Sequence, residues 1–202
     1  MKLFINQTSP YARKVRIVVK EKKLDSRIAL VDVDPWSDPP ALLEFSPLSK
    51  VPVLVTDDGI KLSESDTITR YLDELMPSPP LMPADFEGRT EVASRIALLQ
   101  GMIDAAFDAV IEKRRPVPAQ WTDWVLRQQR AIERGLIVMA KFPRPDARFD
   151  LGDVSLACLL GYLDFRHPAI AWRTNFPELA SWFNAVSQRP AVASTNPDLP
   201  VC

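Results

Sequence analysis

A proline-rich segment divides this chain into two parts with different patterns of apolar residues. Residues 77–83 read Pro-Ser-Pro-Pro-Leu-Met-Pro. A helix cannot continue through them, because proline lacks the amide donor and its ring clashes with the preceding turn. The 202 residues suffice for two small domains, each with its own apolar core. We therefore expect a first domain over residues 1–77, a linker over residues 78–85 and a second domain over residues 86–202.

The first part has the pattern of alternating strands and helices. The apolar run at residues 3–5 suits a buried strand. Ser9 and Pro10 suit the start of a helix, because serine caps the first turn and proline loses no needed hydrogen bond there. A second strand is expected over residues 28–33, before a proline-rich loop. Residues 51–55 and 60–62 then flank an Asp-Asp-Gly turn and predict a hairpin, which a helix over residues 63–76 follows.

The second part predicts helices alone. Apolar residues recur at helical spacing over residues 92–110, 121–139 and 179–186. The run from Val154 to Leu163 is apolar on nearly all sides, as a central buried helix requires. Asp150 and Asp153 match a capping box at its start. The expected fold is therefore an α/β domain followed by an all-α domain.

Composition and charge exclude several classes of function. The formal net charge of -1 gives no electrostatic footprint for nucleic acid. No apolar run has the length of about 20 residues that a membrane span needs, and the first residues turn polar too soon for a secretory signal. Cys158 and Cys202 have no local partner, so we expect a cytoplasmic protein. The single histidine, His167, argues against a metal site and is expected on the surface or at a helix end.

Ser9 is the first candidate for chemistry, because it lies between the first strand and the first helix. A helix amino terminus offers free amide donors and a partial positive charge, which favour an anion such as a thiolate. A free thiol titrates near pH 8.5, and a helix terminus lowers that value by roughly one to several units. The serine hydroxyl would donate one further hydrogen bond. The alternative is that Ser9 is only the helix cap.

Two further segments carry candidate binding residues. Val51-Pro52 opens the third strand, and with a cis bond the Val51 amide and carbonyl would turn outward and pair with an extended peptide. Glu64 and Ser65 begin the next helix, where the hydroxyl and the neighbouring amides could hold a carboxylate. The alternative for this segment is a plain acidic first turn, which the helix dipole also favours.

Three blocks of the sequence resemble the signature blocks of cytosolic glutathione S-transferases, in the same order and spacing. The blocks are Ser9–Arg16, Ser46–Leu54 and Glu64–Leu72. In addition, Gly152–Ala157 resembles the capping motif of that family's helical domain, so the similarity covers nearly the whole chain. The resemblance implies a thioredoxin-like first domain, an all-helical second domain and a homodimer.

The resemblance also implies a role for each candidate residue. Ser9 matches the hydroxyl that stabilises the glutathione thiolate in bacterial, serine-type members, and no cysteine stands at positions 8–12. Thr8 and Tyr11 are further hydroxyls that could assist it. The resemblance further implies that Pro52 is cis and that Val51 pairs with the cysteinyl backbone of glutathione. It places Glu64 and Ser65 at the γ-glutamyl end and Lys50 near the glycyl carboxylate. The departures are Ser46, Ser49 and Thr67, which stand where Asn, Gly and Ala are usual.

The leading hypothesis is a glutathione transferase that conjugates glutathione, as co-substrate, to a small-molecule electrophile in detoxification. It needs no metal, no nucleic acid and no membrane. The first alternative is a non-catalytic, transferase-shaped binding or regulatory protein. The second is a glutathione-dependent isomerase, dehalogenase or reductase, which the sequence does not separate from a broad transferase.

Overall fold

The computed structural model describes residues 1–142 and 149–197, so Cys202 lies outside the described residues. The chain divides into two compact units. The first comprises Met1–Pro83 together with the described residues from Pro190 onward, and the second comprises Ala84–Arg189. The sequence placed the last residues in the helical part, whereas the short helix α9 (Pro190–Ala193) packs against the first helix of the α/β unit.

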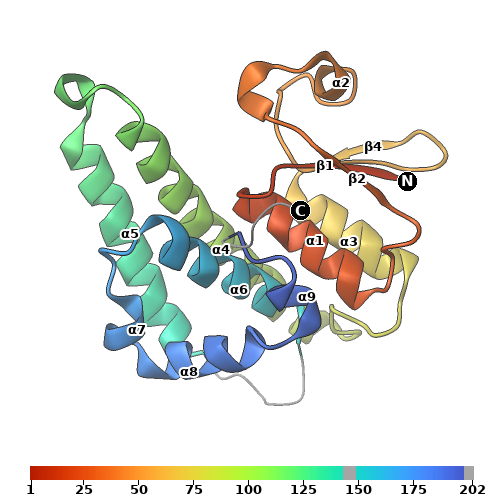
Figure 1. Cartoon of the computed structure of the whole chain (residues 1–202). Helices are drawn as coiled ribbons and strands as arrows, with labels where there is room; N and C mark the ends of the chain where they lie inside the picture. Colours follow the sequence, from red (N-terminus) through yellow and green to blue (C-terminus); the bar gives the residue numbers. More distant parts are fainter. Residues whose placement is uncertain (143–148, 198–202) are drawn as a thin grey trace. The chain divides into compact units, whose positions relative to one another are not determined.

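The first unit is built on a four-stranded sheet (Figure 1). Its elements are β1 (Lys2–Ile5), α1 (Pro10–Glu21), β2 (Ala29–Asp32), η1 (Pro35–Ser37), α2 (Pro40–Leu43), β3 (Val53–Val55), β4 (Lys61–Ser63), α3 (Ser65–Leu75) and α9. The strand order is β2-β1-β3-β4, with β2 parallel to β1 and the other two pairs antiparallel. The expected order of strands and helices is confirmed, and η1 and α2 are additions within the proline-rich loop.

The two faces of this sheet are covered by different helices. Phe4 and Val53 pack with Leu42 of α2 on one face. Because side chains alternate along a strand, the buried residues Leu3 and Ile5 point to the opposite face, where α1 and α3 lie side by side (Figure 1). The sheet is therefore the middle layer of the unit.

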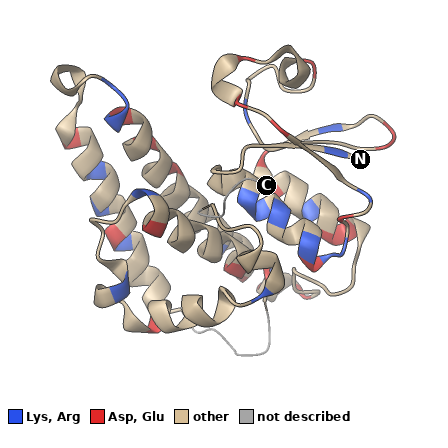
Figure 2. Cartoon of the chain, in the orientation of Figure 1, with Lys and Arg blue, Asp and Glu red and all other residues tan. Residues whose placement is uncertain are grey.

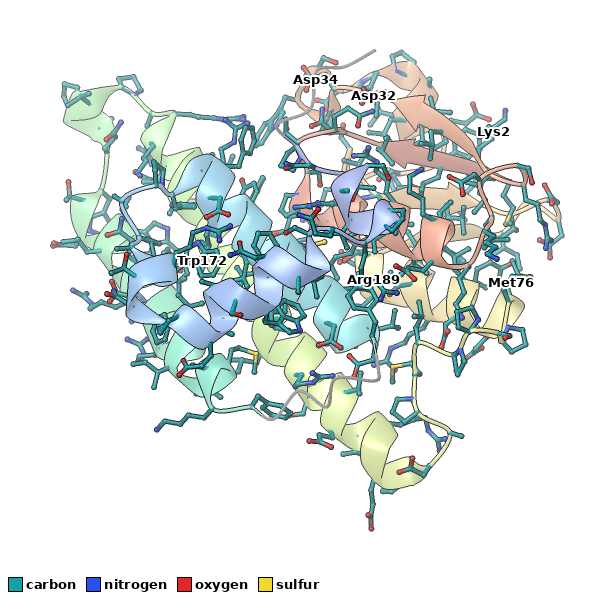
Figure 3. The ribbon with its side chains drawn as sticks, turned by 60° about the horizontal axis from the view of Figure 1, so that its bottom comes forward. Lys2, Asp32, Asp34, Met76, Trp172 and Arg189 are labelled. Atoms are coloured by element: carbon teal, nitrogen blue, oxygen red, sulfur yellow. The ribbon has the colours of Figure 1, made fainter. Side chains whose placement is uncertain are left out.

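A buried lysine fastens the segment after α3 to this unit. The Lys22 side chain has no exposed surface, and its Nζ lies 2.5 Å from Asp73 Oδ1. Nζ also donates to the carbonyl of Met76 at 2.8 Å and to that of Pro79 (Met76 is labelled in Figure 3). Asp73 in turn accepts from the amide of Leu81 at 2.8 Å. The first proline-rich residues after α3 are thus part of the α/β unit.

The second unit consists of helices. They are α4 (Phe86–Lys113), η2 (Val117–Ala119), α5 (Thr122–Ala140), α6 (Leu151–Arg166), α7 (Trp172–Asn175) and α8 (Pro177–Val186). α4 packs against both α5 and α6, and every residue of α6 from Leu151 to Leu163 is buried. Trp172, also buried and labelled in Figure 3, packs edge-on against Phe183 of α8 with ring centroids 5.8 Å apart. The expectation of a central buried helix is confirmed.

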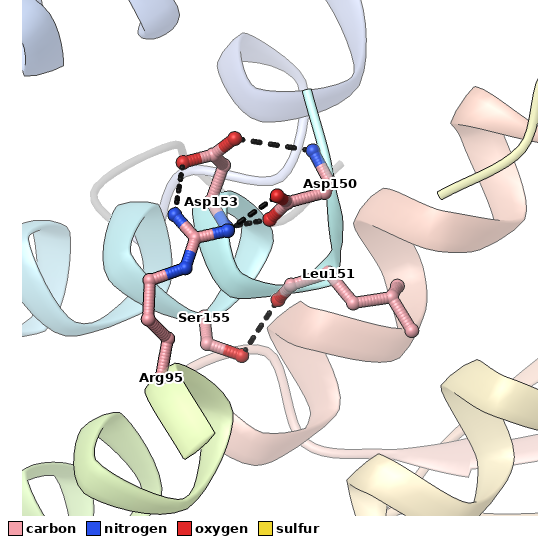
Figure 4. A network of polar contacts seen from close by, with 5 residues as sticks. All are labelled: Arg95, Asp150, Leu151, Asp153 and Ser155. Atoms are coloured by element: carbon pink, nitrogen blue, oxygen red, sulfur yellow. Dashed lines mark hydrogen bonds and ion pairs between the residues drawn. The ribbon is translucent and has the colours of Figure 1, made fainter. Parts of the chain in front are cut away.

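The start of α6 carries the expected capping box and an arginine clamp beside it (Figure 4). The Asp150 carboxylate accepts from the Asp153 amide at 3.0 Å, and the Asp153 carboxylate accepts from the Asp150 amide at 3.1 Å. Arg95 of α4 pairs with both carboxylates. Gly152 leaves room for it, because a Cβ there would lie 2.7 Å from the guanidinium.

His167 ends α6 and is buried, not on the surface. Only 2% of the residue is exposed, and its Nε2 lies 2.9 Å from the carbonyl oxygen of Ala106 on α4. Burial lowers the pKa of the imidazole, the hydrogen bond to Ala106 opposes this shift, and the nearby cations Lys113 and Arg166 add to it. The neutral ring is therefore the favoured form in the folded protein at pH 7.

Among the described residues, no helix combines the length and the apolar character that a membrane crossing demands.

Replacing Arg95 with leucine should destabilise the helical unit by about 3 kcal/mol, because it leaves two largely buried carboxylates without their counter-charge. Urea unfolding measures the change. The control is Arg115→Leu, which removes an exposed guanidinium 3.7 Å from Glu112 and should cost less than about 1 kcal/mol. Equal losses of unfolding free energy in Arg95→Leu and Arg115→Leu would contradict a stabilising role for the Arg95 ion pairs.

His167 should make stability fall as the pH decreases below about 6.5, the unperturbed histidine value. The folded pKa lies below the unfolded one, so in this window the unfolded chain binds more protons. The free energy of unfolding should decrease by up to about 1.4 kcal/mol per pH unit. Urea unfolding between pH 5 and pH 7 measures the slope. Because the chain has a single histidine, His167→Gln should flatten it; an unchanged slope would refute the assignment.

Candidate functional site

The strand register brings the predicted site segments to one edge of the sheet. Phe4, next to the last residue of β1, pairs with Val53, the first residue of β3. Val53 also pairs with Ser63, the last residue of β4. Three segments therefore lie at this edge: the one that leaves β1 for Ser9, the one that enters β3 from Val51, and the one that leaves β4 for Ser65. The structure thus places the three predicted segments on the same side of the α/β unit.

The loop between β1 and α1 is fixed by Asn6. Its Nδ2 donates to the Val33 carbonyl at 3.2 Å, and its Oδ1 accepts from the Thr8 amide at 3.2 Å and the Thr8 hydroxyl at 2.8 Å. The Thr8 hydroxyl thus already donates its single proton to Asn6. The geometry favours Ser9 over Thr8 as a donor to a bound group.

Ser9 caps α1, and its hydroxyl can still donate a hydrogen bond. Its Oγ accepts from the Ala12 amide at 3.2 Å, and it is half-buried. A hydroxyl that accepts one hydrogen bond can also donate one. Both readings of Ser9 made from the sequence are thus compatible: it is the helix cap, and its hydroxyl proton remains available at a helix amino terminus, where the backbone favours an anion.

A buried ion pair joins the amino-terminal halves of α1 and α3, and the sequence pattern did not reveal it. Lys14 of α1 is 1% exposed and pairs with Asp66 of α3, whose side chain is 31% exposed. Figure 2 shows how basic the residues of α1 are. Helical spacing alone would assign such residues to a solvated face. The pair holds the helix that begins after Ser9 to the helix that begins at Ser65.

The Val51–Pro52 peptide bond is cis, as the resemblance implies. Pro52 is buried and Val51 half-buried. The ladder with β1 begins at Val53, and no described residue forms a hydrogen bond with the backbone of Val51. Its amide and carbonyl therefore remain available to an extended peptide.

The segment before Val51 is positioned by the two serines that replace the usual Asn and Gly. The Ser46 hydroxyl accepts from the Lys50 amide at 3.2 Å and donates to the Lys50 carbonyl at 3.1 Å. Ser49 has φ = 49°, in the left-handed region that favours glycine, and its hydroxyl donates to the Pro35 carbonyl at 2.8 Å. The side chain of Lys50 is exposed.

Glu64 and Ser65 combine backbone strain with an unmet hydrogen bond. Glu64 is exposed and has φ = 69°, a conformation that costs a residue with a side chain about 1–3 kcal/mol. Ser65 is 1% exposed, and its Oγ is buried without a partner among the described residues. A buried hydroxyl without a partner is also costly. Both features are accounted for if the start of α3 receives a polar ligand.

The described residues contain no group of three histidines, cysteines or acids that could hold a metal ion. The site instead offers hydroxyls at two helix amino termini and, between them, one unpaired backbone segment. This arrangement suits a small peptide with an anionic group at each helix.

Both units match models of one protein family. Residues 8–75 match the N-terminal domain of glutathione S-transferases, and residues 94–185 match the C-terminal domain. A curated relative is the uncharacterized GST-like protein YibF of Escherichia coli, which is 32% identical over 201 residues and 98% of each chain.

The similarity to solved structures extends over nearly the whole chain. A glutathione S-transferase of Methylobacterium radiotolerans in complex with glutathione sulfonate has a TM-score of 0.90 and 34% identity, covering 100% of this chain and 96% of its own. A glutathione transferase family member of Pseudomonas fluorescens with bound glutathione has a TM-score of 0.90 and 36% identity, covering 98% and 99%. The expected architecture, a thioredoxin-like unit and an all-helical one, is confirmed.

Replacing Asp66 with asparagine should destabilise the α/β unit by about 3 kcal/mol, because the Lys14 charge stays buried without its carboxylate. Lys14→Met should cost less, since Asp66 remains partly hydrated. Thermal or urea unfolding measures both. The control is Asp25→Asn, whose pair with Lys20 is exposed and should contribute less than about 1 kcal/mol. Equal free energies of unfolding for Asp66→Asn and Asp25→Asn would show that the Lys14–Asp66 pair does not stabilise the unit.

Proposed function

Because this chain belongs to the glutathione S-transferase family, we propose that it binds glutathione along the edge of its α/β unit and conjugates the tripeptide to a small electrophile. The observation that carries the proposal is the hydroxyl of Ser9, which caps α1 and retains a proton. In this role the helix terminus and the hydroxyl together stabilise the glutathione thiolate. The active site is then of the serine type found in bacterial members of the family.

The remaining contacts follow the length of the tripeptide. Val51, whose amide and carbonyl bond to no described residue, pairs with the cysteinyl backbone next to the cis bond to Pro52. Ser65 donates its hydroxyl, which has no partner among the described residues, to the γ-glutamyl carboxylate, and Glu64 receives the α-ammonium group there. Lys50, whose exposed side chain is flexible, reaches the glycyl carboxylate.

Catalysis in this proposal is binding, orientation and charge stabilisation. Glutathione supplies the nucleophile, and the protein lowers the pKa of its thiol so that the thiolate is present near neutral pH. The thiolate sulfur forms a bond with the electrophilic carbon, and the leaving group departs with its electron pair. A detoxification role, a homodimer and a cytoplasmic location complete the proposal, as is usual for this family.

A pH titration of the absorbance of bound glutathione tests the thiolate directly. We expect a bound pKa at least about one unit below the free value of about 8.5, and Ser9→Ala should raise it by about one unit. Thr8→Val serves as the control, because the Thr8 proton already goes to Asn6. A bound pKa near the free value, or equal pKa values with and without the Ser9 hydroxyl, would refute the mechanism.

Retention on glutathione resin separates the transferase from a binding or regulatory protein of the same shape. A transferase should be retained and should elute with free glutathione. Failure of the protein to bind the resin would favour the non-catalytic alternative.

A further inference from the structure

Asn6 connects the ends of two strands to the start of α1. Its Nδ2 donates to the carbonyl of Val33, the residue after β2, at 3.2 Å. Its Oδ1 accepts from the amide and the hydroxyl of Thr8 at 3.2 and 2.8 Å, and its backbone carbonyl accepts from the Ser9 amide at 3.1 Å. The residue that follows β1 therefore holds the end of β2 and the two residues before α1 together.

These bonds require a side chain with an amide group at this distance from the backbone. The partners fix the orientation of the amide, because the Val33 carbonyl can only accept a hydrogen bond and the Thr8 amide can only donate one. An aspartate would have no N–H for Val33, and an alanine would make neither bond. A glutamine would carry its amide one methylene too far. The chemistry of asparagine is thus used in full at position 6.

The strands themselves do not depend on the Asn6 side chain. β1 and β2 form a parallel ladder that ends with Ile5 opposite Asp32. The Val33 amide extends this ladder by donating to the Ile5 carbonyl at 2.9 Å. A role confined to the strands would use the bond from Asn6 to Val33 but would not need the two bonds to Thr8. The side chain therefore acts mainly on the loop that leads to α1.

The backbone at the start of α1 makes the placement of Ser9 important. Pro10 has no N–H, the Ser9 amide donates to the Asn6 carbonyl, and the Ala12 amide donates to Ser9 Oγ at 3.2 Å. The first turn of α1 contains no acidic residue that would oppose an anion there. A sulfur anion at this helix end thus depends on where the Ser9 hydroxyl lies.

We propose that Asn6 is a positioning residue for the glutathione thiolate: it fixes the Ser9 hydroxyl at the amino end of α1 and keeps the Thr8 hydroxyl turned to itself. This inference rests on the proposed function, since it takes the sulfur to lie at Ser9. Asn6 touches no part of the tripeptide and acts through Ser9. Without its side-chain amide the loop loses its anchor at Val33, and the Ser9 hydroxyl adopts several positions, of which few reach the sulfur.

The pKa of the bound glutathione thiol tests this role, because it reports the hydrogen bond at the sulfur. We expect Asn6→Ala to raise that pKa by about half a unit or more, toward the value in Ser9→Ala. The affinity for S-methylglutathione, which has no ionisable thiol, should change less than about twofold, because Val51 and Ser65 are untouched. A wild-type thiol pKa in Asn6→Ala would overturn the positioning role.

The matched control is Thr56→Ala, which removes a side chain that orders another turn of the same unit. The Thr56 hydroxyl accepts from the Ile60 amide at 2.8 Å and donates to Asp58. This β3–β4 turn lies at the end of the ladder opposite to the site edge. Thr56→Ala should therefore keep the wild-type thiol pKa. An equal rise of the pKa in Thr56→Ala and Asn6→Ala would overturn the role in favour of a general loosening of the unit.

Hydrogen exchange of the protein without glutathione tests the loop independently of the ligand. The Thr8 amide should exchange about tenfold faster or more in Asn6→Ala, because it loses its acceptor, and at the wild-type rate in Thr56→Ala. A raised thiol pKa with unchanged exchange would show that Asn6 does not act by ordering the loop, and would overturn the proposal. If the wild-type protein left the thiol pKa at its free value, the proposed function would fail, and the role of Asn6 with it.

Discussion

The antiparallel pairing of β1 with β3 is the constraint on which the candidate site depends. Because Phe4 pairs with Val53, and Val53 with Ser63, the chain leaves β1, enters β3 and leaves β4 at a single edge of the sheet. A shift of one residue would turn every strand side chain to the opposite face, so the apolar cores on the two faces keep this register. Residues far apart in the sequence are thereby fixed close to one another.

At this edge, unmet polar groups coexist with well-paired surroundings. Lys14 and Asp66 join the helix starts, and Asn6 orders the loop before Ser9. In contrast, the backbone of Val51 and the hydroxyl of Ser65 have no partner among the described residues. Folding usually pairs buried polar groups, so rigid surroundings with unpaired groups at the centre are typical of a site made ready for a ligand. A tripeptide with a thiol and two carboxylates has the complementary groups.

Much of the fold was predictable because it is encoded locally. The hairpin follows from a turn whose glycine adopts φ = 84°, and the capping box of Asp150 and Asp153 forms both of its hydrogen bonds. The roles of buried charges were not predictable, since lysine is almost never fully buried unless it is paired, and the carboxylate partners of Lys14 and Lys22 lie about 50 positions away. His167 was expected on the surface or at a helix end; it does end α6, but its burial was not predictable, because its partner is on another helix. The site residues were found from local signals at helix and strand starts, and their ligand contacts stay predictions.

A crystal structure of this protein with bound glutathione is the most direct test of the account. The account predicts the cysteinyl sulfur within hydrogen-bond distance of Ser9 Oγ, the peptide paired with the Val51 backbone, and a carboxylate at Ser65 Oγ. A tripeptide bound elsewhere, or one at this edge with its sulfur directed away from Ser9, would contradict it.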